Sequence, residues 1–209
     1  MIAIIDYKAG NLRSVERALR MLGFSCKVTR DKEEISDSDK IIFPGVGAAG
    51  KALADLKDLG LDNVLKNAFE AGKPILGICL GAQIVLDSSE ENNAKCLGLI
   101  KGKAKQFPFP LFSAGHERLK IPHMGWNAVR LIKDHPVLSG IMPGDEFYFV
   151  HAYYPMPDTD KYVIGVTHYG MEFPSVIGYQ NLIAMQFHPE KSGPSGLKIL
   201  KNFCSWNGF

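Results

Sequence analysis

Residues 73–86 read KPILGICLGAQIVL and carry the strongest structural signal in the chain. A short apolar run leads into Gly77-Ile78-Cys79-Leu80-Gly81, and a segment compatible with a helix follows directly. A strand, a sharp turn flanked by glycines and a helix form the layout of a nucleophile elbow, here with cysteine at the apex in place of serine. Cys79 is therefore a candidate nucleophile. The alternative at this point is an inert buried cysteine, which is common in apolar segments.

The composition is that of an ordinary globular protein. The 209 residues are 46% apolar and 22% charged, which predicts one large domain over residues 1–209. A net charge of +2 favours neither nucleic acid nor a membrane surface as a partner. No apolar run approaches the ~18 residues of a membrane span, and the first residues lack a basic leader. The four cysteines are widely spaced without a C-x-x-C pair, which indicates no metal site and predicts a reduced, cytoplasmic protein.

The first 90 residues alternate between strand and helix patterns. Apolar runs predict strands at 2–5, 24–28, 40–43 and 73–78, with a helix after Asn11, which we expect to cap it, and a helical stretch over 52–72. Such alternation implies a parallel sheet covered by helices on both faces. The polar stretch 88–93 is interpreted as a surface loop. Short strands then dominate, at 97–100, 128–132, 147–151, 162–168, 175–179 and 182–187, before a last helix over 196–204.

His188 is the candidate general base for Cys79. It ends the apolar run 183–187 and is followed by Pro189 and Glu190, so the carboxylate could accept a hydrogen bond from the imidazole. Sites gather at the carboxyl ends of parallel strands, where this histidine would lie. Taken alone, His188 is better interpreted as a surface histidine at a strand end. The pairing with an upstream cysteine elbow favours the catalytic interpretation.

The segment Gly45-Val46-Gly47 follows the third predicted strand. Two glycines around one residue allow a backbone whose N–H groups can turn toward a ligand, so this segment could complete an oxyanion hole. The alternative is a plain turn from strand to helix. It is not a dinucleotide fingerprint, since no G-x-G-x-x-G follows the first strand, and the chain has no P-loop.

Three motifs together resemble those of the class I (triad) glutamine amidotransferases, and they read PGVG at 44–47, GICLGAQ at 77–83 and QFHPE at 186–190. More narrowly, the chain is similar to the glutaminase subunits of imidazole glycerol phosphate synthases. That likeness rests on DY at 6–7, GNL at 10–12, PHMGWN at 122–127, FYFVH at 147–151 and PEKS at 189–192. The resemblance covers nearly the whole chain. It implies an α/β, class I glutamine amidotransferase-like (flavodoxin-like) fold of three layers, with a mainly parallel central sheet and additional antiparallel strands in the second half.

The resemblance also implies the chemistry. Cys79, His188 and Glu190 would hydrolyse L-glutamine to glutamate and ammonia, with no cofactor and no metal. An oxyanion hole is implied at the backbone of Gly45, Val46, Gly47 and Leu80. Glutamine binding is implied at Gly47, Gln83, Ala152 and Tyr153.

The implied partner is a (β/α)₈-barrel cyclase subunit that receives the ammonia and forms imidazole glycerol phosphate and AICAR in L-histidine biosynthesis. The residues that match partner-facing positions are Asn11, Trp126, Tyr148 and Lys191. Trp126 lies among polar residues expected to form a loop. In the subunit without its partner, we expect the N–H of Val46 to point away from Cys79.

Some residues depart from the family pattern. Ala49, Ala82 and Ala152 replace a usual phenylalanine, methionine and hydroxyl residue, and the stretch 106–110 is unfamiliar and predicts only a loop or bent edge. These changes leave open a paralogous glutaminase that feeds another synthase, such as a surface-sugar amidotransferase. Of the other histidines, we expect surface or turn positions for His116, His135 and His168, and structural or near-interface positions for His123 and His151.

Overall fold

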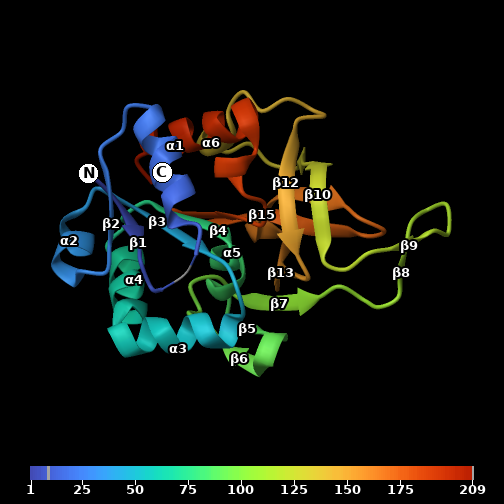
Figure 1. The fold of residues 1–209 in the computed structure, drawn as a ribbon, viewed down its shortest axis with the longest axis horizontal. Helices are drawn as coiled ribbons and strands as arrows, with labels where there is room; N and C mark the ends of the chain where they lie inside the picture. The colour runs from blue at the N-terminus through green and yellow to red at the C-terminus, as the bar shows by residue number, and fades with distance from the viewer. Residues whose placement is uncertain (9, 209) are drawn as a thin grey trace.

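The computed structural model describes residues 1–8 and 10–208, and its centre is a sheet of eight strands (Figure 1). In spatial order these are β11 (Arg130–Leu131), β14 (Val163–His168), β15 (Glu172–Tyr179), β16 (Leu182–Met185), β4 (Ile75–Cys79), β3 (Lys40–Gly45), β1 (Ile2–Ile5) and β2 (Cys26–Thr29). The strands from β16 to β2 run parallel, whereas β15, β14 and β11 are added antiparallel. The predicted α/β fold class, with antiparallel strands from the second half, is confirmed.

Helices cover both faces of this sheet, as the alternating pattern predicts. Helices α1 (Leu12–Met21) and α6 (Gly193–Ser205) pack on one face, and α2 (Lys32–Asp37), α3 (Ala49–Leu59) and α4 (Leu61–Glu70) on the other (Figure 1). Successive side chains of a strand point to opposite faces, so Ile4 joins one core and Ile5 the other, both fully buried. The three layers are confirmed.

The second half of the chain adds smaller sheets beside the central one. One of them pairs β10 (His123–Ala128) with β12 (Glu146–His151). A second has four strands, in the order β13 (Tyr153–Pro157), β7 (Gly102–Gln106), β5 (Ser88–Ser89) and β6 (Ala94–Lys95). The third is the hairpin of β8 (Leu111–Phe112) and β9 (Arg118–Leu119). Short helices complete the described chain: α5 (Leu80–Ile84) and the 3₁₀ turns η1 (Glu91–Asn93), η2 (Pro136–Leu138), η3 (Asp160–Tyr162) and η4 (Pro189–Lys191).

The predicted helical stretch 52–72 is helical and is divided in two, because Gly60, at φ 66°, ends α3 and begins α4. Other predicted elements differ from the structure for local reasons. Residues 97–100 form no strand. The backbone N–H groups of Leu97 and Leu99 donate instead to the carbonyls of Ile84 and Val85 at the end of α5, which satisfies them without a sheet. Helix α2, which the sequence patterns did not indicate, starts at the Asp31 side-chain cap.

Other differences bear on the site. Asn11 stands at the N-cap position of α1, but its backbone is left-handed and its side chain makes no cap. Trp126 lies in β10 and not in a loop, and the predicted loop 88–93 contains β5 and η1. The stretch 106–110 leaves the end of β7, buries Phe107, exposes Phe109 and leads into the β8–β9 hairpin.

Candidate active site

Three predicted motifs meet at the carboxyl edge of the parallel strands. The register pairs Gly45 at the end of β3 with Cys79 at the end of β4, and Ile78 with Met185 at the end of β16. His188 follows β16 three residues later. Sequence segments more than thirty residues apart are thus neighbours because parallel strands end side by side.

The turn at Cys79 is strained and closely packed. Cys79 has φ 55° and ψ −107°, which a residue with a side chain adopts only where its surroundings enforce it. A Cβ added to Gly81 would lie 2.2 Å from the carbonyl oxygen of Phe43, and one added to Gly77 would lie 2.9 Å from the Cβ of Ala184. Glycine at both positions therefore lets α5 start directly against the neighbouring strands. The result is the nucleophile elbow that the sequence predicts.

His188 is held by Glu190 through a buried hydrogen bond. Its Nδ1 lies 2.8 Å from Glu190 Oε1, and the two side chains are 2% and 0% exposed. Burial disfavours the charged ring, but the Cys79 thiol and the Glu190 carboxylate outweigh it and raise the pKa of His188 to about 9. Because Nδ1–H donates to the carboxylate, Nε2 is left to exchange a proton. This Nε2 is buried and has no hydrogen-bond partner among the described residues.

Asn11 is a second partner of Glu190. Its Nδ2 donates to the same Oε1 that accepts from His188. The left-handed backbone of Asn11 turns this side chain away from the helix that it precedes. A residue predicted to face a partner therefore also contacts the Glu190 carboxylate.

Cys79 and His188 line one cavity of about 340 Å³, a size that suits a small molecule. Its walls are Val46, Gly47, Cys79, Leu80, Gln83, Glu91, Pro122, Val150, His151, Ala152, Tyr153 and His188. All four predicted glutamine-binding residues are among them. Of the predicted oxyanion residues, Val46, Gly47 and Leu80 line the cavity. Gly45 is not among the lining residues, and a Cβ added to it would lie 2.0 Å from the hydroxyl of Tyr7.

The amide of Gln83 has a defined orientation. Its Nε2 donates to the carbonyl of Tyr153 at 2.9 Å and to Gln186 Oε1 at 3.0 Å, which uses both amide hydrogens. The carbonyl oxygen of the Gln83 side chain is therefore the atom left to meet a ligand donor. Gln186 in turn places its Nε2 3.7 Å from the Cys79 sulfur.

Glu91 is a cavity residue that sequence reasoning missed. It belongs to η1, in the stretch predicted as a surface loop, and it supplies a carboxylate to the cavity wall. Its Oε2 accepts the backbone N–H of Ala49 at 2.6 Å, at the start of α3. No local sequence pattern marks such a residue, because its position depends on the packing of η1 against α3.

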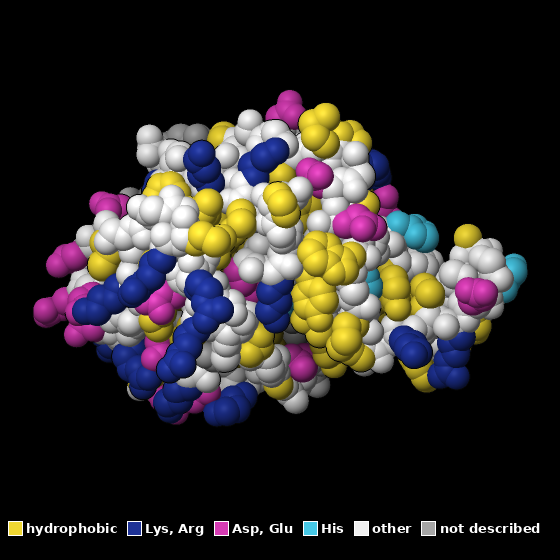
Figure 2. Space-filling model, turned by 45° about the horizontal axis from the view of Figure 1, so that its top comes forward, with side chains coloured by type: hydrophobic (Ala, Val, Ile, Leu, Met, Phe, Trp, Pro, Cys, Tyr) yellow, Lys and Arg dark blue, Asp and Glu magenta, His cyan; other side chains and the backbone are white. Residues whose placement is uncertain are grey.

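The predicted partner-facing residues lie together outside the triad. The Trp126 and Tyr148 rings are 6.2 Å apart, and the Lys191 ammonium lies 5.6 Å from the Tyr148 ring centre. Trp126 is 53% exposed, and its β10 neighbour Met124 is 62% exposed. Hydrophobic side chains gather on the face where β10 and β12 lie in Figure 1 (Figure 2). Tyr148 also contacts the triad directly, since its carbonyl accepts the N–H of His188.

The remaining histidines divide as the sequence suggests. His116 and His168 are exposed, and His135 accepts the N–H of Val137 at the start of η2. His123 and His151 are buried and bonded to each other. Within residues 1–8 and 10–208, no three His, Cys, Asp or Glu side chains are grouped to hold a metal ion, and no described helix is long and apolar enough to cross a membrane.

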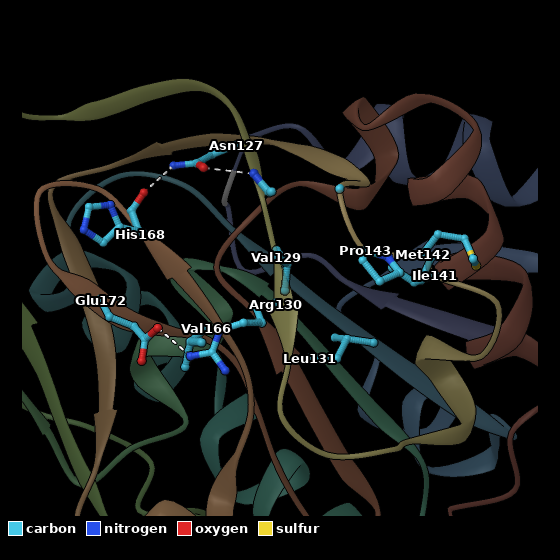
Figure 3. A pocket seen from close by; sticks show the side chains of 12 residues that line it. Asn127, Val129, Arg130, Leu131, Ile141, Met142, Pro143, Val166, His168 and Glu172 are labelled. Atoms are coloured by element: carbon cyan, nitrogen blue, oxygen red, sulfur yellow. Dashed lines mark hydrogen bonds and ion pairs between the residues drawn. The ribbon is translucent and has the colours of Figure 1, made fainter.

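A second cavity, of about 490 Å³, lies away from the triad (Figure 3). It is bounded mainly by apolar side chains such as Val129, Leu131 and Ile141, with Arg130 and Glu172 paired at 2.6 Å. None of the triad residues lines it. The predicted nucleophile Cys79 and the predicted base His188 line the smaller cavity instead.

Known proteins share both the sequence and the fold. The family "Glutamine amidotransferase class-I" matches residues 3–206. The chain is 49% identical over 206 residues to the imidazole glycerol phosphate synthase subunit HisH of Nitratidesulfovibrio vulgaris (strain Miyazaki F), covering 99% of this chain and 97% of the relative. It is 50% identical to the protein of that name in Maridesulfovibrio salexigens, with the same coverage.

Solved structures match the fold at lower identity. The crystal structure of a glutamine amidotransferase aligns over 100% of both chains, with a TM-score of 0.76 and 17% identity. The structure of PurLQS from Thermotoga maritima aligns over 98% of this chain and 97% of that chain, with a TM-score of 0.74 and 20% identity.

Proposed function

The chain belongs to the class-I glutamine amidotransferase family, and we propose that it is the glutaminase subunit of an imidazole glycerol phosphate synthase in histidine biosynthesis. The observation that carries this proposal is the meeting of Cys79 with the buried His188–Glu190 pair at one cavity. Relatives of about 50% identity over nearly the whole chain carry the name of that subunit. We include residues 1–209 in one glutamine amidotransferase domain.

The triad geometry suits cysteine hydrolysis of an amide. Cys79 attacks the side-chain carbonyl carbon of glutamine while His188 Nε2 takes the thiol proton. The C–N bond then breaks, and His188 returns the proton to the leaving nitrogen, which departs as ammonia. Water, deprotonated by the same ring, attacks the thioester and releases glutamate with the free thiol. Glu190 holds Nδ1–H throughout, so Nε2 remains the working nitrogen.

Oxyanion stabilisation falls to backbone groups around the elbow. The N–H of Leu80, at the start of α5, and one N–H of the segment 45–47 are the donors, and one such donor contributes roughly 2.7–4 kcal/mol to transition-state stabilisation in other enzymes. Gly47, at φ 94°, gives that segment the freedom to aim an N–H at the developing charge. We expect the Val46 N–H to turn toward Cys79 only when the partner is bound.

Glutamine recognition uses the far wall of the cavity. The free side-chain oxygen of Gln83 and the Glu91 carboxylate are acceptors for the α-ammonium of the substrate. The backbone of Ala152 and Tyr153 supports the same end of the ligand. Because glutamate lacks the amide that Cys79 attacks, the cavity binds it only as product.

The partner that we propose is a (β/α)₈-barrel cyclase docked over Asn11, Trp126, Tyr148 and Lys191. Asn11 and Tyr148 contact triad residues, and the four residues include an exposed tryptophan, the residue type most often central to interfaces. Ammonia released into water would be protonated and lost as a nucleophile. Docking beside the triad therefore allows its direct transfer to the acceptor.

The test is glutamate release measured with and without a cognate barrel cyclase and its nucleotide ligand. We expect the partner to raise the rate of the wild-type chain strongly and Cys79→Ala to abolish it. Cys204→Ala, which alters another buried cysteine outside the cavity, is the matched control. No glutamate from the wild-type complex would refute the proposal. Labelling of Cys79 by diazo-oxo-norleucine without stimulation by this cyclase would instead favour a paralogue that serves another synthase.

A further inference from the structure

A row of hydrogen-bonded polar groups, with two buried histidines at its centre, joins strand β10 to the glutamine cavity. Asn127 Nδ2 lies 3.3 Å from His123 Nε2, His123 Nδ1 lies 3.0 Å from His151 Nε2, and His151 Nδ1 lies 2.8 Å from the carbonyl oxygen of Tyr153. The two histidine side chains belong to residues that are only 2% and 5% exposed. Neither histidine belongs to the triad.

The donor and the acceptor in each hydrogen bond of this row follow from the groups at its two ends. The Tyr153 carbonyl can only accept, so His151 carries its hydrogen on Nδ1, and its Nε2 must accept from His123 Nδ1–H. His123 Nε2 then accepts from Asn127, whose amide also donates to the carbonyl of His168 and accepts from the N–H of Ala128. Figure 3 shows these last two contacts of Asn127. Both neutral rings are fully satisfied, with one donor and one acceptor each.

The surroundings keep these rings neutral and fixed. His123 is stacked between Tyr169 and Phe149, with ring centres 4.0 and 4.9 Å away. Burial lowers the pKa of His123 to about 4 and that of His151 to about 3. Protonation of either histidine would turn its accepting nitrogen into a donor and break one hydrogen bond of the row. The tautomers are therefore defined by the structure over the ordinary pH range.

The row ends on an atom that the substrate site uses. The Tyr153 carbonyl accepts from His151 on one side and from Gln83 Nε2 on the other. That second bond helps to orient the Gln83 amide with its oxygen free for a ligand. A displaced Tyr153 carbonyl would release Gln83 Nε2, and the amide could turn.

We propose that Asn127, His123 and His151 are positioning residues that hold the Tyr153 carbonyl, and through it the Gln83 amide, in the orientation that binds glutamine. This inference rests on the proposed glutaminase function. The row starts on β10, whose other face carries the exposed Met124 and Trp126. The strand proposed to meet the partner is thus tied by hydrogen bonds to the glutamine cavity.

Two substitutions at His123 separate its hydrogen bonds from its packing. His123→Phe keeps an aromatic ring between Tyr169 and Phe149 but cannot donate to His151. His123→Asn loses the ring, yet its amide can still donate to His151 Nε2. The matched control is His135→Phe, which removes the acceptor for the Val137 N–H at a partly buried histidine outside the cavity.

The experiment measures KM and kcat for glutamine with saturating partner, together with the rate at which iodoacetamide alkylates Cys79. We expect His123→Phe to raise KM about ten-fold, the effect of one lost buried hydrogen bond, with kcat changed less than about three-fold. His123→Asn should keep KM within about two-fold of wild type. Alkylation, which needs the triad but not Gln83, should be unchanged in both.

Equal KM values for the wild type and His123→Phe would overturn the inference. So would a larger defect in His123→Asn than in His123→Phe, since that order indicates packing alone. If the wild-type complex releases no glutamate, the proposed function fails instead. The row itself is then tested by ¹⁵N NMR of the histidine rings, where Nε2–H tautomers at His123 or His151 would contradict it.

Discussion

Cys79 has a positive φ, and the segments around it pack so closely that its backbone cannot relax. The strain at φ 55° is tolerated because β3, β4 and α5 pack against one another at the glycines that flank the turn. The Cys79 sulfur is thereby held in the cavity wall by regular secondary structure and does not depend on a loop. Rigidity at this residue is a property of its neighbours.

Gly81 tests that dependence. An added Cβ would meet the Phe43 carbonyl oxygen at 2.2 Å, so Gly81→Ala must displace β3 or α5. We expect it to lower the free energy of unfolding by about 1–3 kcal/mol, and glutamine turnover to fall with it. Urea unfolding measures the first quantity. Gly115→Ala, where the nearest atom is 3.8 Å from the added Cβ, should change neither; equal effects in the two variants would refute the steric argument.

Glu190 tests the orientation of the base. Glu190→Gln removes the charge that helps to raise the pKa of His188 and presents an amide to Nδ1. We expect kcat to fall on the order of 10⁴-fold, as when a serine-protease triad loses its carboxylate. The measurement is partner-stimulated glutamate release. Glu172→Gln, an exposed glutamate paired with Arg130, is the control and should retain activity.

At the scale of elements, the β10–β12 ladder brings His123 and His151 opposite each other in register. Both rings have a pKa below the ordinary 6.5, so the unfolded chain binds protons that the folded chain excludes. Stability due to this pair is present above pH 6.5 and is lost as the pH falls from there, toward about 4 for His123 and about 3 for His151. His188 behaves oppositely, because its raised pKa makes its contribution decline only as the pH rises from 6.5 toward about 9.

The lowered pKa values of His123 and His151 predict that the fold loses stability in acid. Between pH 6.5 and about 4, each of the two histidines should reduce the free energy of unfolding by up to ~1.4 kcal/mol per pH unit. Urea unfolding at pH 7 and pH 5 measures the loss. His123→Asn lacks one of the two titrating histidines, so its free energy of unfolding should fall less between pH 7 and pH 5 than that of the wild type. The control is His116→Gln, at an exposed histidine, which should lose as much stability as the wild type. If His123→Asn also loses as much as the wild type, the prediction is contradicted.

At the scale of the whole molecule, the surface beside the triad is where we propose that the partner binds. Trp126 is 53% exposed, whereas Trp206 is 5% exposed in the core. If the partner docks on β10, Trp126→Ala should weaken its binding about thirty-fold, as expected of a tryptophan hot spot. Isothermal titration with the cyclase measures this. Tyr179→Ala, at another exposed aromatic residue that pairs with Leu182 at the end of β16 opposite to the triad, should bind normally. Comparable losses in both variants would place the interface elsewhere.

The sequence by itself determined the elements whose signals are local. The elbow at 77–81, the strand before it and the pair His188–Glu190 are all short-range patterns, since backbone sterics and strand periodicity act over a few residues. The parallel sheet with helices on both faces followed from the alternation of strands and helices. The triad could therefore be proposed before its members were seen together.

Only the tertiary structure decided what depends on contacts between distant segments. Residues 97–100 form no strand because their N–H groups meet the end of α5, and Glu91 enters the cavity because η1 packs near the start of α3. The left-handed Asn11 turns its amide to Glu190, 179 residues away in the chain. The row from Asn127 to Tyr153 likewise needs β10, β12 and β13 to be assembled. Hydrogen-bond satisfaction in the folded core sets these features, and no window of neighbouring residues encodes it.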